Sequence, residues 1–214
     1  MNTDVARDGE RTRGVRAALS LAPVYRLAQN AVGADRFRSA LTQEYLRVVP
    51  GDRILDLGCG TADILDHLPT TDYIGFDPSE RYVTDARSRF GDRGRFVTSL
   101  DDATELQVDR TLAIAIGVLH HVDDRSAASM IELAASSLEP GGRMVTVDPT
   151  IVDGQHWAAK FLASQDRGQH VRSPEGTAEL FSAFDLVKVS VRHDLLRMPY
   201  SHVIVEASQP RHPR

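Results

Sequence analysis

The stretch ILDLGCGTADIL, residues 54–65, places a tight glycine turn between two aspartates. An apolar run reaches Asp56, passes through the turn Gly58–Ala62 and continues into a segment of helical character. Gly58 and Gly60 would let the backbone approach a ligand closely, and the following helix would present free N–H groups to it. Such a turn could hold a phosphate, hold another nucleotide-like ligand, or simply join a strand to a helix.

The charges around this turn argue against a phosphate ligand. Asp56 precedes the glycines and Asp63 follows them, and two carboxylates would repel a pyrophosphate. The lysine of a phosphate-binding P-loop is also missing. Asp77 ends the next expected strand, where a ribose-binding acid belongs in a parallel sheet. A positively charged nucleoside fits this arrangement, and S-adenosylmethionine, a sulfonium that carries ribose and adenine, is such a molecule.

Three further side chains are candidates for proton transfer. His120 and His121 follow one expected strand, and Asp148 ends another. Because the carboxyl ends of parallel strands meet at one edge of a sheet, these groups are expected near the bound ligand. Imidazole is the side chain that most often serves as a general acid or base. Structural roles remain open for both histidines, since one could cap the next helix or contact the turn.

Alternating strands and helices must position these groups. The apolar spacing predicts strands at Arg53–Leu57, Tyr73–Phe76, Arg95–Val97, Thr111–Ile116 and Arg143–Val147. Helices are expected between them, at Ala62–Leu68, Ser79–Phe90 and Arg125–Leu138. Such alternation predicts a parallel sheet with helices on both faces. The run at Thr111–Ile116 is apolar throughout, as in a strand buried on both faces.

The C-terminal part follows a different pattern. Leu186–His193 and Ser201–Glu206 alternate apolar and polar residues on either side of a short connection, which predicts an antiparallel pair at the edge of the sheet. The expected fold is therefore α/β, a Rossmann-like three-layer sandwich. Its seven-stranded sheet would be mostly parallel, with an antiparallel C-terminal edge hairpin.

The chain is expected to divide into three parts. Residues 1–49 would form an N-terminal tail and two helices that Gly33 separates, residues 50–208 the ligand-binding domain, and residues 209–214 a disordered tail. Between the fifth strand and the edge hairpin, helices are expected at His156–Ser164 and from Ser173.

Composition excludes several classes of function. The 214 residues carry a formal net charge of −5 without a basic patch, which disfavours a nucleic-acid partner. No apolar run is long enough for a membrane helix, and the N-terminal stretch lacks the apolar core of a signal peptide, so a cytoplasmic protein is expected. Cys59 is the single cysteine, expected to be a small buried residue, and no metal site is expected. The expected assembly is a monomer or homodimer.

Four motifs in order resemble those of class I S-adenosylmethionine-dependent methyltransferases of the small "type 11" sort. They are ILDLGCGTAD, GFDPS, AIGVLHHVDD and LEPGGRMVTVDP, within a resemblance that runs from Tyr45 to Glu206. The resemblance departs from the family at Ala62, where a third glycine is usual. It departs again at residues 99–102, where Ser-Leu-Asp-Asp replaces the usual Gly-Asp and leaves open which acid meets the adenine.

The resemblance implies roles for individual residues. It places the cofactor against Asp56, Gly58, Cys59, Gly60, Asp77, Pro78, Asp101 or Asp102, Gly117 and Val118. It also implies that the N-terminal helices, with Tyr25 and Arg36, cover the pocket as a lid. In the polar connection, Asp166, Arg167 and Arg172 could close over the acceptor, because arginines bind carboxylates and phosphates; a surface salt-bridge network is the alternative.

The resemblance implies methyl transfer to a small-molecule acceptor by in-line displacement. One alternative is an enzyme that binds S-adenosylmethionine but attacks another carbon of the sulfonium, releasing methylthioadenosine. A third, from a different class, is a non-catalytic binding protein on the same fold, against which the intact Asp56, Gly58, Gly60 and Asp77 argue.

Overall fold

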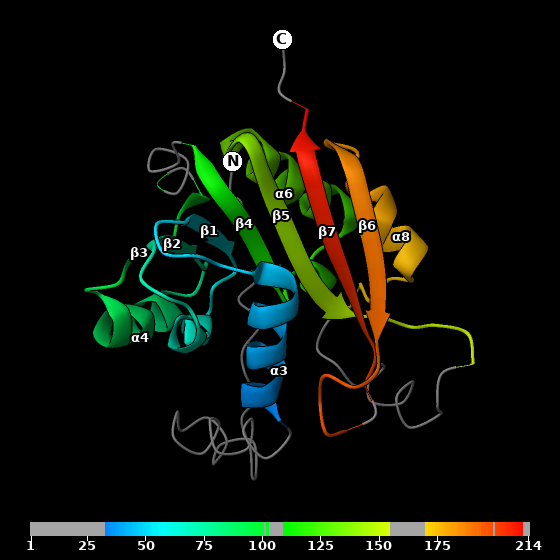
Figure 1. The fold of residues 1–214 in the computed structure, drawn as a ribbon, viewed down its shortest axis with the longest axis horizontal. Helices are drawn as coiled ribbons and strands as arrows, with labels where there is room; N and C mark the ends of the chain where they lie inside the picture. Colours follow the sequence, from blue (N-terminus) through cyan, green and yellow to red (C-terminus); the bar gives the residue numbers. More distant parts are fainter. Residues whose placement is uncertain (1–32, 101, 103–108, 155–169, 199, 212–214) are drawn as a thin grey trace, which may run out of the picture.

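The computed structural model describes residues 33–100, 102, 109–154, 170–198 and 200–211. A seven-stranded sheet in the order β3-β2-β1-β4-β5-β7-β6 runs through it (Figure 1). The strands are β1 (Arg53–Leu57), β2 (Asp72–Phe76), β3 (Gly94–Val97), β4 (Arg110–Ile116), β5 (Leu138–Pro149), β6 (Phe184–Arg192) and β7 (His202–Pro210). β1 to β5 pair in parallel, whereas β7 pairs antiparallel with both β5 and β6. The predicted α/β fold with its antiparallel edge is confirmed.

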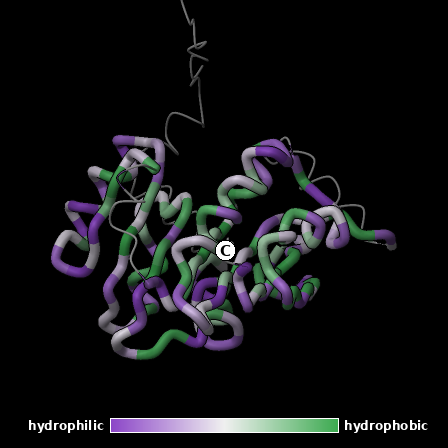
Figure 2. Tube along the Cα trace, turned by 90° about the horizontal axis from the view of Figure 1, so that it is seen from above, coloured by the Kyte–Doolittle hydropathy of each residue, from purple (hydrophilic) through white to green (hydrophobic). Residues whose placement is uncertain are grey.

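Helices cover both faces of the sheet. α3 (Ala34–Leu41), the π-helix η1 (Thr42–Leu46), the 3₁₀ helix η2 (Asp63–His67) and α4 (Glu80–Phe90) bury their apolar side chains on one face. α6 (Asp124–Ser137) and α8 (Pro174–Glu179) cover the other face. Figure 1 shows α3 in front of the sheet and α6 and α8 behind it. In the view from above, many hydrophilic stretches lie at the outer bends of the trace (Figure 2).

Strand β4 shows how the sheet joins the two halves of the core. Leu112 and Ile114 pack with the α3 and α4 side, while Ala113 and Ala115 pack with the α6 side. Successive side chains of a strand point to opposite faces of the sheet, and helices cover both faces. All four side chains are therefore fully buried. A central strand of this kind brings its carboxyl end, where Gly117 begins the next turn, to a fixed place between β1 and β5.

Some local predictions need correction. The segment after the glycine turn is the five-residue 3₁₀ helix η2 and not an α-helix. The fifth strand, predicted at Arg143–Val147, is β5 (Leu138–Pro149), because α6 already ends at Ser137 and Leu138 is extended (φ −79°, ψ 139°). β7 runs to Pro210, and the Arg211 amide donates to the Ala183 carbonyl, so order extends past residue 208. The helix expected at His156–Ser164 lies outside the described residues.

Gly33 was expected to separate two helices, and the first of these lies outside the described residues. Gly33 itself has φ 93° and precedes α3 directly.

In the part of the chain that the structure describes, no helix has the length and apolar character needed to cross a membrane.

Candidate functional site

The glycine turn is tied to the ends of two strands. The amides of Gly58 and Cys59 both donate to the Phe76 carbonyl, at 2.7 and 2.9 Å, which fastens the end of β1 to the end of β2. The Gly60 amide then donates to Oδ2 of Asp77 at 3.0 Å. The turn and the acid that the sequence placed with it therefore meet directly at the carboxyl edge of the sheet.

Positive φ angles explain the composition of this turn. Gly58 has φ 77° and Gly60 has φ 55°, a region that is costly for residues with a Cβ atom. Ala62 also lies in the left-handed region, at φ 55°, and its methyl group is fully buried in the core. The departure from the usual third glycine is thus accommodated at the cost of local backbone strain.

Gly58 is also required by a close approach. A Cβ atom there would lie 2.5 Å from Cγ2 of Val118, the residue after Gly117 at the end of β4. We expect Gly58→Ala to lower the free energy of unfolding by at least about 1 kcal/mol more than Gly141→Ala does. Gly141 is the matched control, because it has φ 89° but a Cβ atom there would meet nothing within 4 Å. Urea unfolding of both variants checks this, and equal losses would contradict the steric argument.

Asp77 is buried but keeps hydrogen-bonding capacity. Its residue exposure is 9%, and its Oδ1 accepts from the Ser79 amide at 2.9 Å. Each carboxylate oxygen can accept more than one hydrogen bond, so two anchored oxygens can still accept from a ligand's hydroxyls. Pro78 beside it is exposed. A Cβ at Gly60 would meet no atom of the described residues within 4 Å, so this part of the structure leaves space beside Asp77. These features fit a ribose-bearing ligand.

The two carboxylates that flank the turn carry less negative charge toward a ligand than the sequence suggested. Asp63 forms ion pairs with Arg38, at 3.1 Å, and with Arg89. Asp56 is 2% exposed and accepts a hydrogen bond from the Tyr73 hydroxyl. The prediction that both carboxylates would attract a cationic ligand is therefore wrong. Asp63 is paired with arginines, and Asp56 is directed at Tyr73 of β2. Asp77 provides the anionic character of the turn.

Burial raises the pKa of Asp56 from 3.8 to about 7, although the hydrogen bond from Tyr73 opposes this rise. In the unfolded chain this carboxyl loses its proton near its ordinary pKa. Between these two values the folded state binds more protons, so the free energy of unfolding falls as pH rises. We expect Asp56→Asn to remove a slope of about 1 kcal/mol per pH unit in this window. Urea titrations at pH 5 and 7 test this, with the exposed Asp66→Asn as control; parallel slopes for wild type and Asp56→Asn would contradict it.

Cys59 contributes backbone and packing to the turn. A Cβ at Gly75 would lie 2.7 Å from the Cys59 Sγ, so the thiol packs directly against the β2 backbone. Burial, with Asp56 and Asp77 nearby, raises the pKa of the Cys59 thiol far above its usual range. A thiol held in the protonated form is a poor nucleophile and metal ligand. Among the described residues, no group of three or more His, Cys, Asp or Glu side chains could hold a metal ion.

The turn after β4 contacts both the glycine turn and the end of β5. The Gly117 amide donates to the Val147 carbonyl at 2.7 Å, and the Val118 side chain lies against Gly58. Among the residues that the structure describes, a Cβ at Gly117, which has φ 68°, would meet only the His120 Cε1 within 4 Å, at 3.9 Å. The structure thus brings together the segments after β1, β2, β4 and β5, which the sequence placed at one edge.

His120 and Asp148 form a buried pair at this edge. The Nδ1 atom of His120 lies 2.8 Å from Oδ1 of Asp148, and both side chains are 6% exposed. The His120 amide donates to the same oxygen at 3.2 Å. A carboxylate oxygen facing Nδ1 favours the tautomer that carries its proton there, which leaves Nε2 as the basic nitrogen. The pair therefore has the geometry of an oriented general base.

The Asp148 carboxylate is held in an unusual environment. Burial raises its pKa, and the hydrogen bond and charge of His120 oppose that rise. Its Oδ2 atom is buried without a hydrogen-bond partner among the described residues. His121 differs, since it is exposed and its ring lies 4.0 Å from that of His120, centroid to centroid. His120 belongs to the buried pair, whereas His121 lies at its surface.

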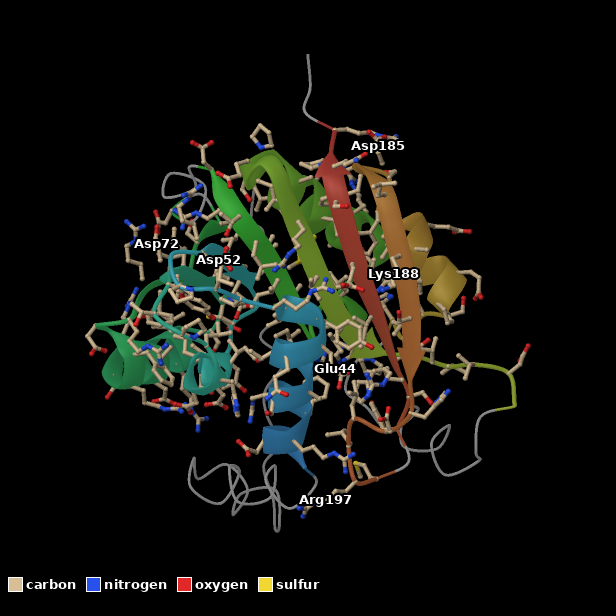
Figure 3. The ribbon with its side chains drawn as sticks, viewed as in Figure 1. Glu44, Asp52, Asp72, Asp185, Lys188 and Arg197 are labelled. Carbon is tan, nitrogen blue, oxygen red and sulfur yellow. The ribbon has the colours of Figure 1, made fainter. Side chains whose placement is uncertain are left out.

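The substrate candidates divide into three groups. Arg36 is exposed and lines an open groove of about 400 Å³ between α3 and Arg197, which does not include Gly58, Asp77 or Asp148. Figure 3 labels Glu44 on η1, directly after α3, and Arg197 near the N-terminal end of α3. Arg172 points its guanidinium at the backbone beside His120 and not at open space, which corrects its expected role over the acceptor. The other substrate candidates, Tyr25, Asp166 and Arg167, lie outside the described residues. Of the two acids expected at the adenine, Asp101 also lies outside them and Asp102 is exposed.

Tyr73 is a site residue that the sequence did not single out. It is 1% exposed, and its hydroxyl reaches Asp56 from the neighbouring strand. The register pairs Asp56 with Gly75, two residues beyond Tyr73 and on the same face as it. A tyrosine within an otherwise apolar strand was the available signal, since a buried hydroxyl needs a hydrogen-bond partner.

Comparison with protein families and sequences gives two findings. A family model described as "Methyltransferase domain" matches residues 30–191. An O-methyltransferase of Pyrenophora dematioidea is 31% identical over an alignment of 118 positions, which covers 51% of this chain and 43% of that protein. The chain thus spans less than half of the length of this relative.

Solved structures share the fold over most of the chain. The S-adenosylmethionine-dependent methyltransferase SibL in its apo form superposes with a TM-score of 0.68 at 18% identity, covering 92% of this chain and 61% of that one. The [4+2]-cyclase SpnF superposes with a TM-score of 0.61 at 16% identity, covering 83% and 82%. Identities this low establish the shared fold alone.

Proposed function

The chain belongs to the methyltransferase domain family, and from this premise we propose that it transfers a methyl group from S-adenosylmethionine to a small-molecule acceptor. S-adenosylmethionine is its cofactor. The observation that carries the proposal is the position of the His120–Asp148 pair at the same edge as the turn that holds Asp77. Asp77 could bind the ribose of the cofactor, and the His120–Asp148 pair could accept a proton from the acceptor.

Residues of the first two strand ends would hold the cofactor. Asp77 would accept hydrogen bonds from the ribose hydroxyls, and the backbone of Gly58, Cys59 and Gly60 would line its amino-acid part. Gly117 and Val118 would border the same part from β4, because Val118 already contacts Gly58. Asp101 or Asp102 would meet the adenine, with Pro78 beside it. When bound, S-adenosylmethionine supplies an electrophilic methyl group on a sulfonium that leaves as a neutral thioether.

His120 would activate the acceptor. Nε2 of His120 would take the proton of the attacking group while Asp148 holds Nδ1–H and stabilises the imidazolium that forms. With the cofactor held by Asp77 and the glycine turn, the acceptor's electron pair would form the new bond to the methyl carbon as the carbon–sulfur bond breaks, and the electrons of that bond would stay on sulfur. Alignment of the attacking atom with the methyl carbon supplies much of the rate enhancement, up to about 7–11 kcal/mol in favourable cases. The protein's task is thus to hold both reactants in line and to remove one proton.

The acceptor class follows from charge and from the named relative. A formal net charge of −5 opposes a polyanionic substrate such as RNA. The O-methyltransferase relative supports oxygen as the attacking atom. Deprotonating a hydroxyl group is the step for which a histidine base is most useful, because the anion is the better nucleophile. We therefore propose a hydroxyl-bearing small molecule.

Calorimetry followed by product analysis tests this function. We expect S-adenosylhomocysteine and S-adenosylmethionine to bind at one site per chain. Incubation of S-adenosylmethionine with a panel of phenols and alcohols should then give S-adenosylhomocysteine and a methylated product. No binding would exclude both methyl transfer and the alternative chemistry on this cofactor. Methylthioadenosine as the product would favour that alternative, and binding without any product would favour a non-catalytic protein.

A further inference from the structure

Arg172 forms hydrogen bonds with the backbone of the short turn that carries His120. Its Nη1 atom donates to the Leu119 carbonyl at 2.6 Å and to the His170 carbonyl at 3.2 Å. Its Nη2 atom donates to the Val122 carbonyl at 2.8 Å. One guanidinium thus holds carbonyls on both sides of His120 in the turn formed by the 3₁₀ helix η3 (Leu119–His121).

The same side chain reaches the start of the next helix. Nε of Arg172 donates to Oδ1 of Asp124 at 2.8 Å, and the Arg172 side chain is only 10% exposed. In addition, the His170 amide donates to the His120 carbonyl at 3.1 Å. The segment around residues 170–172 therefore binds η3 through backbone and side chain together.

The backbone of Arg172 is joined to the strand that carries Asp148. Thr150, two residues after Asp148, forms a parallel bridge with Arg172. The Thr150 hydroxyl donates to the Arg172 carbonyl at 2.8 Å, and Thr150 is fully buried. Arg172 thus connects the element that carries His120 with the element that carries Asp148.

A guanidinium is needed for this connection because η3 is short. Three residues of 3₁₀ helix have little stability of their own, since the hydrogen-bond geometry is poor and few bonds form. The planar guanidinium offers five N–H donors in a rigid fork, whereas a lysine ammonium is a compact charge on a flexible stem. The positive charge of Arg172 also opposes the rise in the pKa of Asp148. Both effects favour one orientation of the histidine ring on a charged carboxylate.

We propose that Arg172 is a positioning residue for the transfer: by clamping η3 to the end of β5 it fixes the orientation of the His120 imidazole on Asp148. This proposal rests on the proposed function of that pair. It replaces the expectation that Arg172 closes over the acceptor. A base that deviates by a fraction of an ångström from its working position loses much of its effect.

Arg93 offers a matched control elsewhere in the fold. Its Nη1 donates to the Leu65 carbonyl at 2.6 Å, and its Nη2 donates to the Leu68 and Pro69 carbonyls at 2.8 and 3.2 Å. This arginine clamps η2, another short 3₁₀ helix, in the same chemical manner. Arg93→Lys and Arg172→Lys therefore remove equivalent carbonyl clamps at different places in the fold.

The test compares turnover, binding and a hydrogen-bond signal in the full chain. We expect Arg172→Lys to lower kcat at least about tenfold with the Kd of S-adenosylhomocysteine unchanged within about twofold, while Arg93→Lys keeps kcat. The loss should shrink at high pH, where the acceptor ionises without a base. Equal loss of kcat in both variants, or full activity of Arg172→Lys, would overturn the clamp while leaving methyl transfer intact.

Proton NMR makes the test independent of turnover. The Nδ1–H proton of His120, bonded to Asp148, should give a downfield resonance in the wild type and in Arg93→Lys. Assignment comes from its loss in His120→Gln. We expect this resonance to weaken or shift in Arg172→Lys, and an unchanged resonance would refute the proposal even if no acceptor were turned over.

Discussion

Replacing His120 by alanine is expected to lower kcat by about 10²–10⁴-fold, the range that a positioned general base contributes. The Kd of S-adenosylhomocysteine should change by less than about threefold, because the imidazole acts on the acceptor side. The physical reason is the 2.8 Å contact between Nδ1 and Asp148, which orients the ring and would stabilise its charged form. Among the described residues, the His120 ring is the only imidazole that forms a hydrogen bond with Asp148, and the substitution removes it.

Two comparisons sharpen this result. Asp148→Asn keeps the size of the side chain but loses the negative charge, so it should retain binding and lose a large part of kcat. His121→Ala removes an exposed ring that contacts the His120 ring at a tilt of 39°, and we expect a smaller loss of kcat with cofactor binding kept. Single-turnover kinetics with S-adenosylmethionine across pH provide the measurement. If His121→Ala were the more damaging change, the assignment of the base to His120 would be wrong.

Asp77→Ala is expected to weaken the binding of S-adenosylhomocysteine by about 2–3 kcal/mol, because two charge-assisted hydrogen bonds to the ribose are lost. That corresponds to a rise in Kd of roughly 30- to 150-fold. The structure adds a second contribution, since Asp77 also accepts from the amides of Gly60 and Ser79. Its removal would loosen the glycine turn as well as the ribose contact.

Calorimetry and thermal unfolding separate these two contributions. Asp77→Asn keeps one acceptor oxygen and the shape, so it should bind more tightly than Asp77→Ala. The control is Asp185→Ala on β6, near the end of the sheet opposite the carboxyl ends of β4 and β5 (Figure 3). A Kd for Asp77→Ala within a factor of two of wild type would place the ribose elsewhere.

The order of elements was readable from the sequence because burial leaves a strong pattern. β4 reads as a continuous apolar run since Leu112 and Ala113 enter different halves of the core. Gly58 and Asp77 were identified because a left-handed turn and a strand-end acid need particular residue types. Both signals are local, so a single sequence reveals them.

Contacts between distant residues were not readable in this way. Arg38 and Arg89 neutralise Asp63 from helices on either side of it, and nothing in the stretch around Asp63 indicates them. The same holds for Arg172, which the sequence offered either as a group that closes over the acceptor or as part of a surface salt-bridge network. Its carbonyl partners lie about fifty residues earlier in the chain, and an unsatisfied carbonyl leaves no mark in composition. Charge was visible in the sequence, but its pairing was not.

The bridge between Thr150 and Arg172 has a consequence for how such a domain can diversify. Because these two residues are bonded to each other, the intervening segment starts and ends at one point of the framework. The entropy cost of closing a flexible loop grows only slowly with its length, by about 0.6 kcal/mol for each doubling. Residues 151–169 could therefore be exchanged as a cassette in a chimera, with His170 and Arg172 kept because they hold η3. By this estimate, segments of different length could be inserted there with little change in the stability of the whole fold.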